Sequence, residues 1–140
     1  MSLLAIPRFV VLLAALLLSG SGALAQSCPL AGQKPMLVAQ LFFGQGVPHG
    51  GDISATQWQS FLRYDVTPRF PDGLTVFDAY GQWRDPKTMH IGRERSKVIE
   101  IVTDDTPDVH AKLEDIAARY RARFHQQSVG IVTMPGCARF

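Results

Sequence analysis

Residues 36–44 read Met-Leu-Val-Ala-Gln-Leu-Phe-Phe-Gly, and this segment decides the fold because apolar side chains occupy both sets of alternate positions. Leu41 and Phe43 would lie on one face of a strand, and Val38 and Phe42 on the other. A strand with two apolar faces is typical of the middle of a sheet. The segment therefore predicts a central strand that needs cover on both sides.

A helix is predicted directly after the Gly-rich loop that follows this strand. Ser54 is a suitable N-cap, and Gln57 three residues later completes a capping box. Trp58 begins the apolar face of this helix. Pro68 ends the segment, because the residue before a proline is excluded from the helical region.

The rest of the chain supplies three more strands and a second helix. Two strands are expected at residues 74–80 and 96–103, and Thr106 is a good N-cap for the helix that follows. A last strand at 129–134 is expected to stop at Pro135. The order predicts an α+β fold of ferredoxin-like βαββαβ type. Right-handed crossovers then give a four-stranded antiparallel sheet, with both helices on one face and the first and third strands in the middle.

The second face of this sheet is a problem that the two helices leave unsolved. The third strand also carries apolar side chains on both sides, with Ile99 and Ile101 opposite Val98 and Val102. A bare apolar face would be an interaction patch. Three kinds of cover stay open: a second copy in a dimeric α+β barrel, an apolar ligand, or the long loops and the N-terminal arm.

The N-terminus carries the pattern of a cleavable export signal. Arg8 precedes an unbroken apolar block from Phe9 to Leu18, which is shorter than the roughly 20 apolar residues of a membrane anchor. Small residues then lead to a cleavage site after Ala25. We therefore expect a signal peptide at 1–25, an N-terminal arm at 26–35 and the ferredoxin-like domain at 36–140.

Export also bears on the two cysteines. A lipoprotein signal would place Leu at the third position before Cys28, where this chain has Ala25, so lipidation is the less favoured hypothesis. In an oxidising compartment, Cys28 and Cys137 are expected to form a disulfide. The predicted topology agrees, because the start of the first strand and the end of the last lie at the same end of the sheet.

The charge of the mature chain excludes a nucleic-acid-binding surface. Arg8 is the one charged residue of the predicted signal, so 13 of the 14 basic side chains remain against 12 acidic ones. A nearly neutral chain has no electrostatic footprint for nucleic acid. No second apolar run approaches the length of a membrane span. The expected location is the periplasm or the extracellular space.

Candidate chemistry gathers at one end of the predicted sheet. The loop after the first strand contributes His49 and Asp52, and the long second hairpin contributes further charged side chains. Such a mouth suits a small anion or acid–base chemistry, since histidine titrates near neutral pH. A solvated charged hairpin is the alternative. No metal site is predicted, because His49 and Asp52 are too few ligands to hold an ion. No cofactor motif is predicted either. The hairpin residues concerned are Arg84, Asp85, His90, Arg93, Glu94 and Arg95.

One segment carries a family resemblance. Residues 67–74 read Thr-Pro-Arg-Phe-Pro-Asp-Gly-Leu, and they occur with Leu-Phe-Phe-Gly at 41–44, Gly-Gln-Trp-Arg at 81–84 and Glu-Arg-Ser-Lys-Val at 94–98. Together these motifs resemble a bacterial family of exported proteins known as domain of unknown function 3574 (DUF3574). The resemblance implies an exported bacterial protein and brings no activity with it.

Arg69, Asp78 and Lys97 join Arg84 and Glu94 as candidate site residues. Arg69 is expected to pair with Asp72, to brace the turn, or to point into a site. Asp78 interrupts an apolar strand and needs a partner if buried, for which Lys97 or Arg84 would serve. Glu94, Lys97 and Arg84 form the first constellation to examine.

Three functions remain open on the sequence. The favoured one is an exported protein that binds a small ligand, as a possible homodimer, on the sheet face or at the charged mouth. The second is a small enzyme without a tightly bound cofactor that uses His49 or His90 with Glu94 and Arg84, which is an analogy of fold alone. The third is an envelope module for protein interaction.

Overall fold

The computed structural model describes residues 28–48, 50–86 and 88–140, so the predicted signal peptide and His49 lie outside the described residues. Four strands, two α-helices and one π-helical turn follow one another in the predicted order. They are β1 (Lys34–Gly44), α1 (Ala55–Phe61), η1 (Leu62–Val66), β2 (Thr75–Arg84), β3 (Ile91–Thr103), α2 (Pro107–Phe124) and β4 (Gly130–Ala138).

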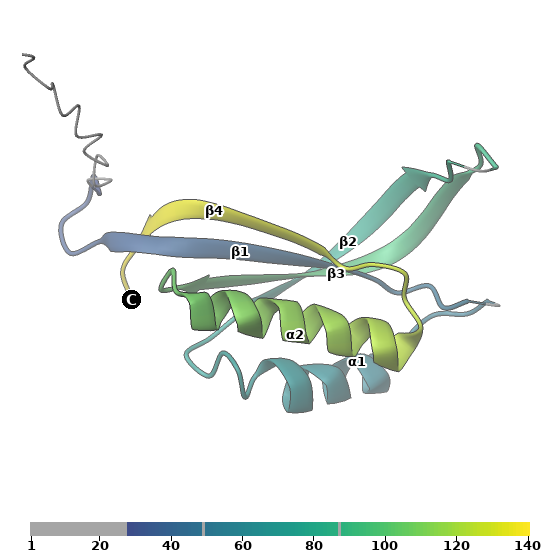
Figure 1. Ribbon diagram of the computed structural model, residues 1–140, viewed down its shortest axis with the longest axis horizontal. Helices are drawn as coiled ribbons and strands as arrows, with labels where there is room; N and C mark the ends of the chain where they lie inside the picture. The colour runs from purple at the N-terminus through teal and green to yellow at the C-terminus, as the bar shows by residue number, and fades with distance from the viewer. Residues whose placement is uncertain (1–27, 49, 87) are drawn as a thin grey trace, which may run out of the picture.

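The strands form one antiparallel sheet in the order β2-β3-β1-β4. Both helices cover the same face of this sheet, and the other face carries no helix (Figure 1). The prediction of a ferredoxin-like α+β fold with β1 and β3 in the middle is confirmed. The sheet therefore has a helix-covered face and a second face, which we call the open face.

Both helices begin where the sequence predicts. Ser54 accepts a hydrogen bond from the Gln57 amide, and the Gln57 side chain accepts one from the Ser54 amide, which is the predicted capping box. Thr106 accepts from the Val109 amide at the start of α2. The first helix continues past Phe61 as the π-helical turn to Val66. The expectation that the residue before Pro68 leaves the helical region is wrong, because Thr67 keeps helical dihedral angles and its amide donates to the Leu62 carbonyl.

The strands are longer than predicted at four places, one of which is the start of β1 at Lys34 instead of residue 36. β2 continues past residue 80 to Arg84, and β3 starts before residue 96, at Ile91. Together they form a long hairpin that rises beyond the helices (Figure 1). The prediction that the last strand stops at Pro135 is wrong, because β4 runs to Ala138. β4 is an edge strand, and an edge strand tolerates a proline whose missing N–H faces solvent.

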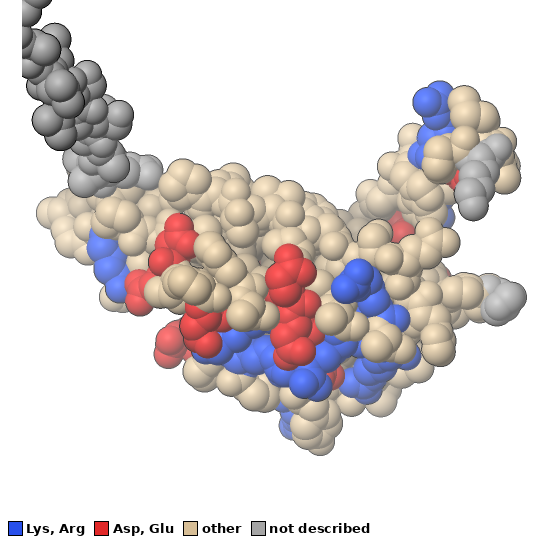
Figure 2. All heavy atoms as spheres, in the orientation of Figure 1, with Lys and Arg blue, Asp and Glu red and all other residues tan. Residues whose placement is uncertain are grey.

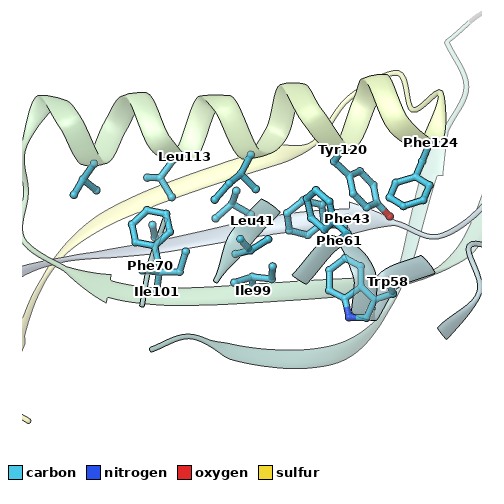
Figure 3. Close-up of a cluster of buried hydrophobic side chains, with 14 of the residues drawn as sticks. Leu41, Phe43, Trp58, Phe61, Phe70, Ile99, Ile101, Leu113, Tyr120 and Phe124 are labelled. Carbon is cyan, nitrogen blue, oxygen red and sulfur yellow. The ribbon is translucent and has the colours of Figure 1, made fainter. Parts of the chain in front are cut away.

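The core lies between the helices and the sheet, with Phe43 at its centre. The Phe43 ring packs edge-on against Trp58, Phe61 and Tyr120, with centroids 5.5, 5.7 and 4.7 Å away (Figure 3). Such edge-to-face pairs add to the stabilisation from apolar burial. Leu41 and Phe43 face this core, as the alternation in β1 predicts.

The predicted disulfide is present. Cys28 and Cys137 are bonded, with their Cα atoms 5.6 Å apart. Cys137 lies opposite Pro35 in the β1–β4 ladder, so the bond ties the N-terminal arm to the end of the last strand. The antiparallel pairing of β1 with β4 brings the two ends of the domain together, as expected.

Candidate functional site

A groove of about 910 Å³ lies between the turn at residues 69–75 and the end of β3. The turn forms one wall, and residues 100–104 of β3 with the first turns of α2 form the other. The N-terminal arm and the C-terminal residues 138–140 close the far side. The turn is built by backbone bonds at its two ends: the Phe70 amide donates to the Val66 carbonyl, and the Gly73 amide to the Phe70 carbonyl.

The strand edge inside this groove is unpaired on one side. The β2–β3 ladder begins with Thr75 opposite Glu100, so residues 101–103 of β3 have no partner in β2. They pair with β1 on their other side, where Thr103 lies opposite Leu37. An unpaired strand edge presents backbone N–H and C=O groups to whatever occupies the space beside it.

The groove has an apolar floor and a polar rim. Phe70, Ile101 and Val109 line it and are buried in the core. Lys112 and Asp72 stand among the rim residues, which carry both signs of charge. A concave site with an apolar lining and a few polar groups is the common form of a small-molecule site.

Arg69 holds the wall of the groove in place. Its guanidinium pairs with Asp115 of α2, with Nε 2.8 Å from the carboxylate, and Nη1 donates to the Asp65 carbonyl oxygen. Arg69 therefore braces the turn through α2 rather than through Asp72. Hydrogen bonds from Arg119 and then Arg69 lower the pKa of Asp115 below its usual value. This charged network ties the turn at residues 69–75 to α2.

Glu94, from the predicted mouth, is bound to the loop after β1. Its carboxylate accepts a hydrogen bond from the Gly46 amide at 3.0 Å, and it lies directly over Gly44. A Cβ at residue 44 would be 2.5 Å from Glu94 Oε1, so only glycine leaves room for this carboxylate. Glu94 thus connects the Gly-rich loop to the hairpin.

Lys97 and Asp78 form the ion pair that the sequence suggested. They are direct neighbours in the β2–β3 ladder, and Asp78 is exposed rather than buried. The hydrogen bond from Lys97 lowers the pKa of Asp78. Lys97 lies opposite Phe43, which faces the helices, whereas Glu94 is an odd number of residues away and faces the open side.

The structure therefore does not bring the predicted constellation together. Glu94 and Lys97 lie on opposite faces of β3, and Arg84 lies opposite Ile91, a further three residues along the hairpin from Glu94. His90 is exposed at the hairpin tip, which rises away from the loop after β1 (Figure 1). An acid–base role for these residues stays a prediction, and His49 lies outside the described residues.

Two absences apply to the described part of the chain. Within residues 28–48, 50–86 and 88–140, no three His, Cys, Asp or Glu side chains form a group that could hold a metal ion. Among the same residues, neither helix has the length and hydropathy of a membrane span.

The groove was not predicted from the sequence, although one segment of the sequence pointed to it. The family-specific run at residues 67–74 supplies most of one wall. Of the candidate residues named from the sequence, Arg69 is the one that lines the groove. Lys112 and Thr103 carry no motif, so their place here follows from the packing of α2 and β3 alone.

Comparison with known proteins gives a family and a fold. The profile of a family described as "Protein of unknown function (DUF3574)" matches residues 38–140. No curated protein matches the chain at a significant level. Among solved structures, a phage SAM lyase in complex with S-methyl-5'-thioadenosine is 14% identical, with 74% of this chain and 88% of that chain covered and a TM-score of 0.59. A phage SAM lyase in the apo state is 16% identical over 72% and 81% of the two chains, with a TM-score of 0.56. At such identities the likeness is one of fold.

Proposed function

We propose that this chain, which belongs to the DUF3574 family, is an exported protein that binds a small ligand in the groove between residues 69–75 and the end of β3. The observation that carries the proposal is the combination of a concave apolar floor with an unpaired strand edge. The volume of about 910 Å³ lies within the range of ligand sites, roughly 300–1,000 Å³.

The walls of the groove support binding because they are held before any ligand arrives. The Arg69–Asp115 pair ties the turn to α2, and the first turn of α2 is capped by Thr106. The floor residue Phe70 is packed into the core. Preorganised walls reduce the ordering cost that a ligand must offset on binding.

The lining defines the kind of ligand. An apolar body would lie against Phe70, Leu74 and Val109, and hydrogen-bonding groups would face the backbone of β3 at residues 101–103. The rim carries Lys112 and Asp72 with their opposite charges. We therefore expect an amphipathic small molecule selected by shape and backbone hydrogen bonds rather than by net charge.

Export is the second part of the proposal. The disulfide supports it, because stable disulfides form in oxidising compartments. Cleavage after Ala25 would leave Gln26 as the first residue of the mature protein. N-terminal sequencing of the protein recovered from the envelope or the medium of its host tests this, and an intact Met1 or a lipidated Cys28 would contradict it.

Native mass spectrometry of the envelope-purified protein tests the ligand. We expect extra mass on the wild type, reduced by Thr103→Trp, which fills the groove, and retained by Thr133→Trp. Thr133 is exposed on β4 outside the groove, so it is the matched control. If Thr103→Trp fails to fold, Lys112→Trp on the helix-side rim of the groove replaces it. Wild-type protein without extra mass, or equal loss in the groove and control variants, would overturn the assignment.

A further inference from the structure

The open face of the sheet exposes large apolar side chains from three strands. The ladder register places them all on the face that carries Phe42 and Val98. Phe77 lies opposite Val98, and Trp83 is six residues further along the same strand. Val132 and Met134 lie opposite Gln40 and Val38, which share the face of Phe42. These large side chains are each between 40% and 50% exposed. They are Phe42 of β1, Phe77 and Trp83 of β2, and Val132 and Met134 of β4.

Two glycines lie close to neighbouring side chains of this face. A Cβ at Gly92 would be 2.8 Å from the Trp83 ring, and a Cβ at Gly136 would be 2.7 Å from Val38 Cγ2. Both glycines therefore leave room for a neighbouring side chain. A broad exposed apolar face is typical of an interaction surface.

The size of the face matches a protein interface. Four strands about 4.8 Å apart span about 19 Å, and the 11 residues of β1 span about 36 Å. The footprint of the whole face, polar side chains included, is therefore about 700 Å² per copy. Two such faces would bury about 1,400 Å², which is within the standard range of about 1,200–2,000 Å².

Three polar side chains of this face, Gln40, Glu94 and Glu100, have partners within the chain. Gln40 Nε2 donates to Glu100 Oε2 at 2.8 Å near the middle, and Glu94 accepts from the Gly46 amide. The charged side chains visible in Figure 2 gather mainly over the helices, while the upper side of the body, where the sheet lies, is mostly uncharged. Covering the open face thus leaves no basic side chain unpaired at its centre.

We propose that two copies of this chain associate through their open faces, sheet against sheet, around a two-fold axis. Such an isologous contact pairs the same apolar patch on both copies. The partner is a second copy because two open faces together supply the area of a standard interface, and because the described arm residues 28–33 leave the face exposed. This inference goes beyond the proposed ligand, whose groove lies at the end of the sheet.

The hairpin shape agrees with this arrangement. The β2–β3 hairpin rises above the open face at one end of the sheet (Figure 1). A two-fold axis that lies in the plane between the two sheets, perpendicular to the strands, places the partner's hairpin at the opposite end, so each hairpin borders the other copy. Trp83 lies on the open side of the hairpin, where a partner would bury it.

Sedimentation equilibrium of the disulfide-intact mature chain tests the proposal with two matched variants. Phe77 and Tyr80 are both exposed aromatic residues of β2, and the odd separation places them on opposite faces. We expect a wild-type dimer with a Kd in the micromolar range or below, as interfaces of this size have. Phe77→Lys should weaken it at least about 30-fold, as the loss of an interface hot spot does. Tyr80→Lys should leave it unchanged.

Acrylamide quenching of tryptophan fluorescence gives a measurement on the wild type. Trp58 is buried in the core, so the change on dilution reports Trp83. We expect Trp83 to be protected from acrylamide at protein concentrations above the dimer Kd, and to be quenched when the protein is diluted below it. A concentration-independent monomer, or equal weakening by both lysine variants, would overturn the proposal. So would a monomer that carries an apolar ligand on this face. The groove variant Thr103→Trp leaves the open face intact, so the failure of one proposal is distinguishable from the failure of the other.

Discussion

Removing the disulfide should cost this domain a large part of its stability. Cys28 and Cys137 are separated by 109 positions, so the bond closes nearly the whole mature chain into one loop. In the chain-entropy model, a loop of that length lowers the entropy of the unfolded chain by an amount worth about 5 kcal/mol at 25 °C. Typical net stabilities are only about 5–15 kcal/mol. We therefore expect the double variant Cys28→Ser, Cys137→Ser to be marginally folded.

Urea unfolding of the mature chain, followed by far-UV circular dichroism, measures this effect. A loss of about 5 kcal/mol at a slope of about 1–3 kcal/mol per molar urea moves the midpoint down by about 2–5 M. Wild-type protein reduced with dithiothreitol should unfold like the double variant, and the double variant should not respond to the reductant. A midpoint shift that corresponds to less than about 1 kcal/mol would refute the reasoning, because the unfolded chain would then gain little freedom from the lost bond.

Three further substitutions test the core, the groove wall and the first helix. Tyr120→Phe removes a buried hydroxyl that donates to the Gly44 carbonyl at 2.7 Å, so it should cost about 1–3 kcal/mol in urea unfolding. Burial, then the nearby negative charge of Glu94, raises the pKa of Tyr120, so wild-type stability should fall as pH rises above about 10, and this fall should be smaller in Tyr120→Phe. The pKa of Asp115 is lowered, so its contribution is present above about pH 4 and is lost as pH falls through the folded-state pKa. Asp115→Asn should therefore lose less stability than the wild type between neutral and acid pH, as measured by thermal unfolding. Ser54→Ala should cost about 1 kcal/mol in urea unfolding, whereas Ser54→Gly should cost only a few tenths.

The elements with strong local signals could be predicted from the sequence. The capping residues Ser54 and Thr106 fix helix starts through bonds to amides two or three residues away, so the signal and the structure share one short segment. The apolar alternation of residues 36–44 fixes a central strand for the same reason. The disulfide followed from the topology, because antiparallel neighbours bring their opposite ends together.

The extension of β2 and β3 into the predicted hairpin could not be predicted, because the outer half of the hairpin lies beyond the helices. There both faces of β2 and β3 meet solvent, so charged side chains replace the apolar alternation that marks a strand. The predicted strands leave out the charged residues 84–95, so Glu94 was not expected within β3. Once β3 is known to start at Ile91, the three-residue separation between Glu94 and Lys97 places them on opposite faces.

The groove depends on where one strand ends, which no motif records. β2 begins opposite Glu100, and the missing pairing beyond it opens the space that the turn at 69–75 borders. A shift of β2 by two residues toward the turn would close this space with a regular ladder. The Arg69–Asp115 pair joins a turn residue to α2 across 46 positions and so ties this wall to the helix. Such a long-range pair is invisible to local sequence patterns.

The two proposed surfaces meet without coinciding. Four groove residues lie on the open face by the ladder register: Met36, Thr75, Glu100 and Val102. Met36 is buried and Glu100 is bonded to Gln40, whereas Thr75 is exposed to both surfaces. Other groove residues, such as Phe70 and Lys112, lie on the helix side of the sheet. A second copy on the open face would therefore cover one end of the groove and leave its helix-side rim accessible. Association and ligand binding thus place separate demands on the sequence: an apolar open face for the first, and a turn braced by Arg69 for the second.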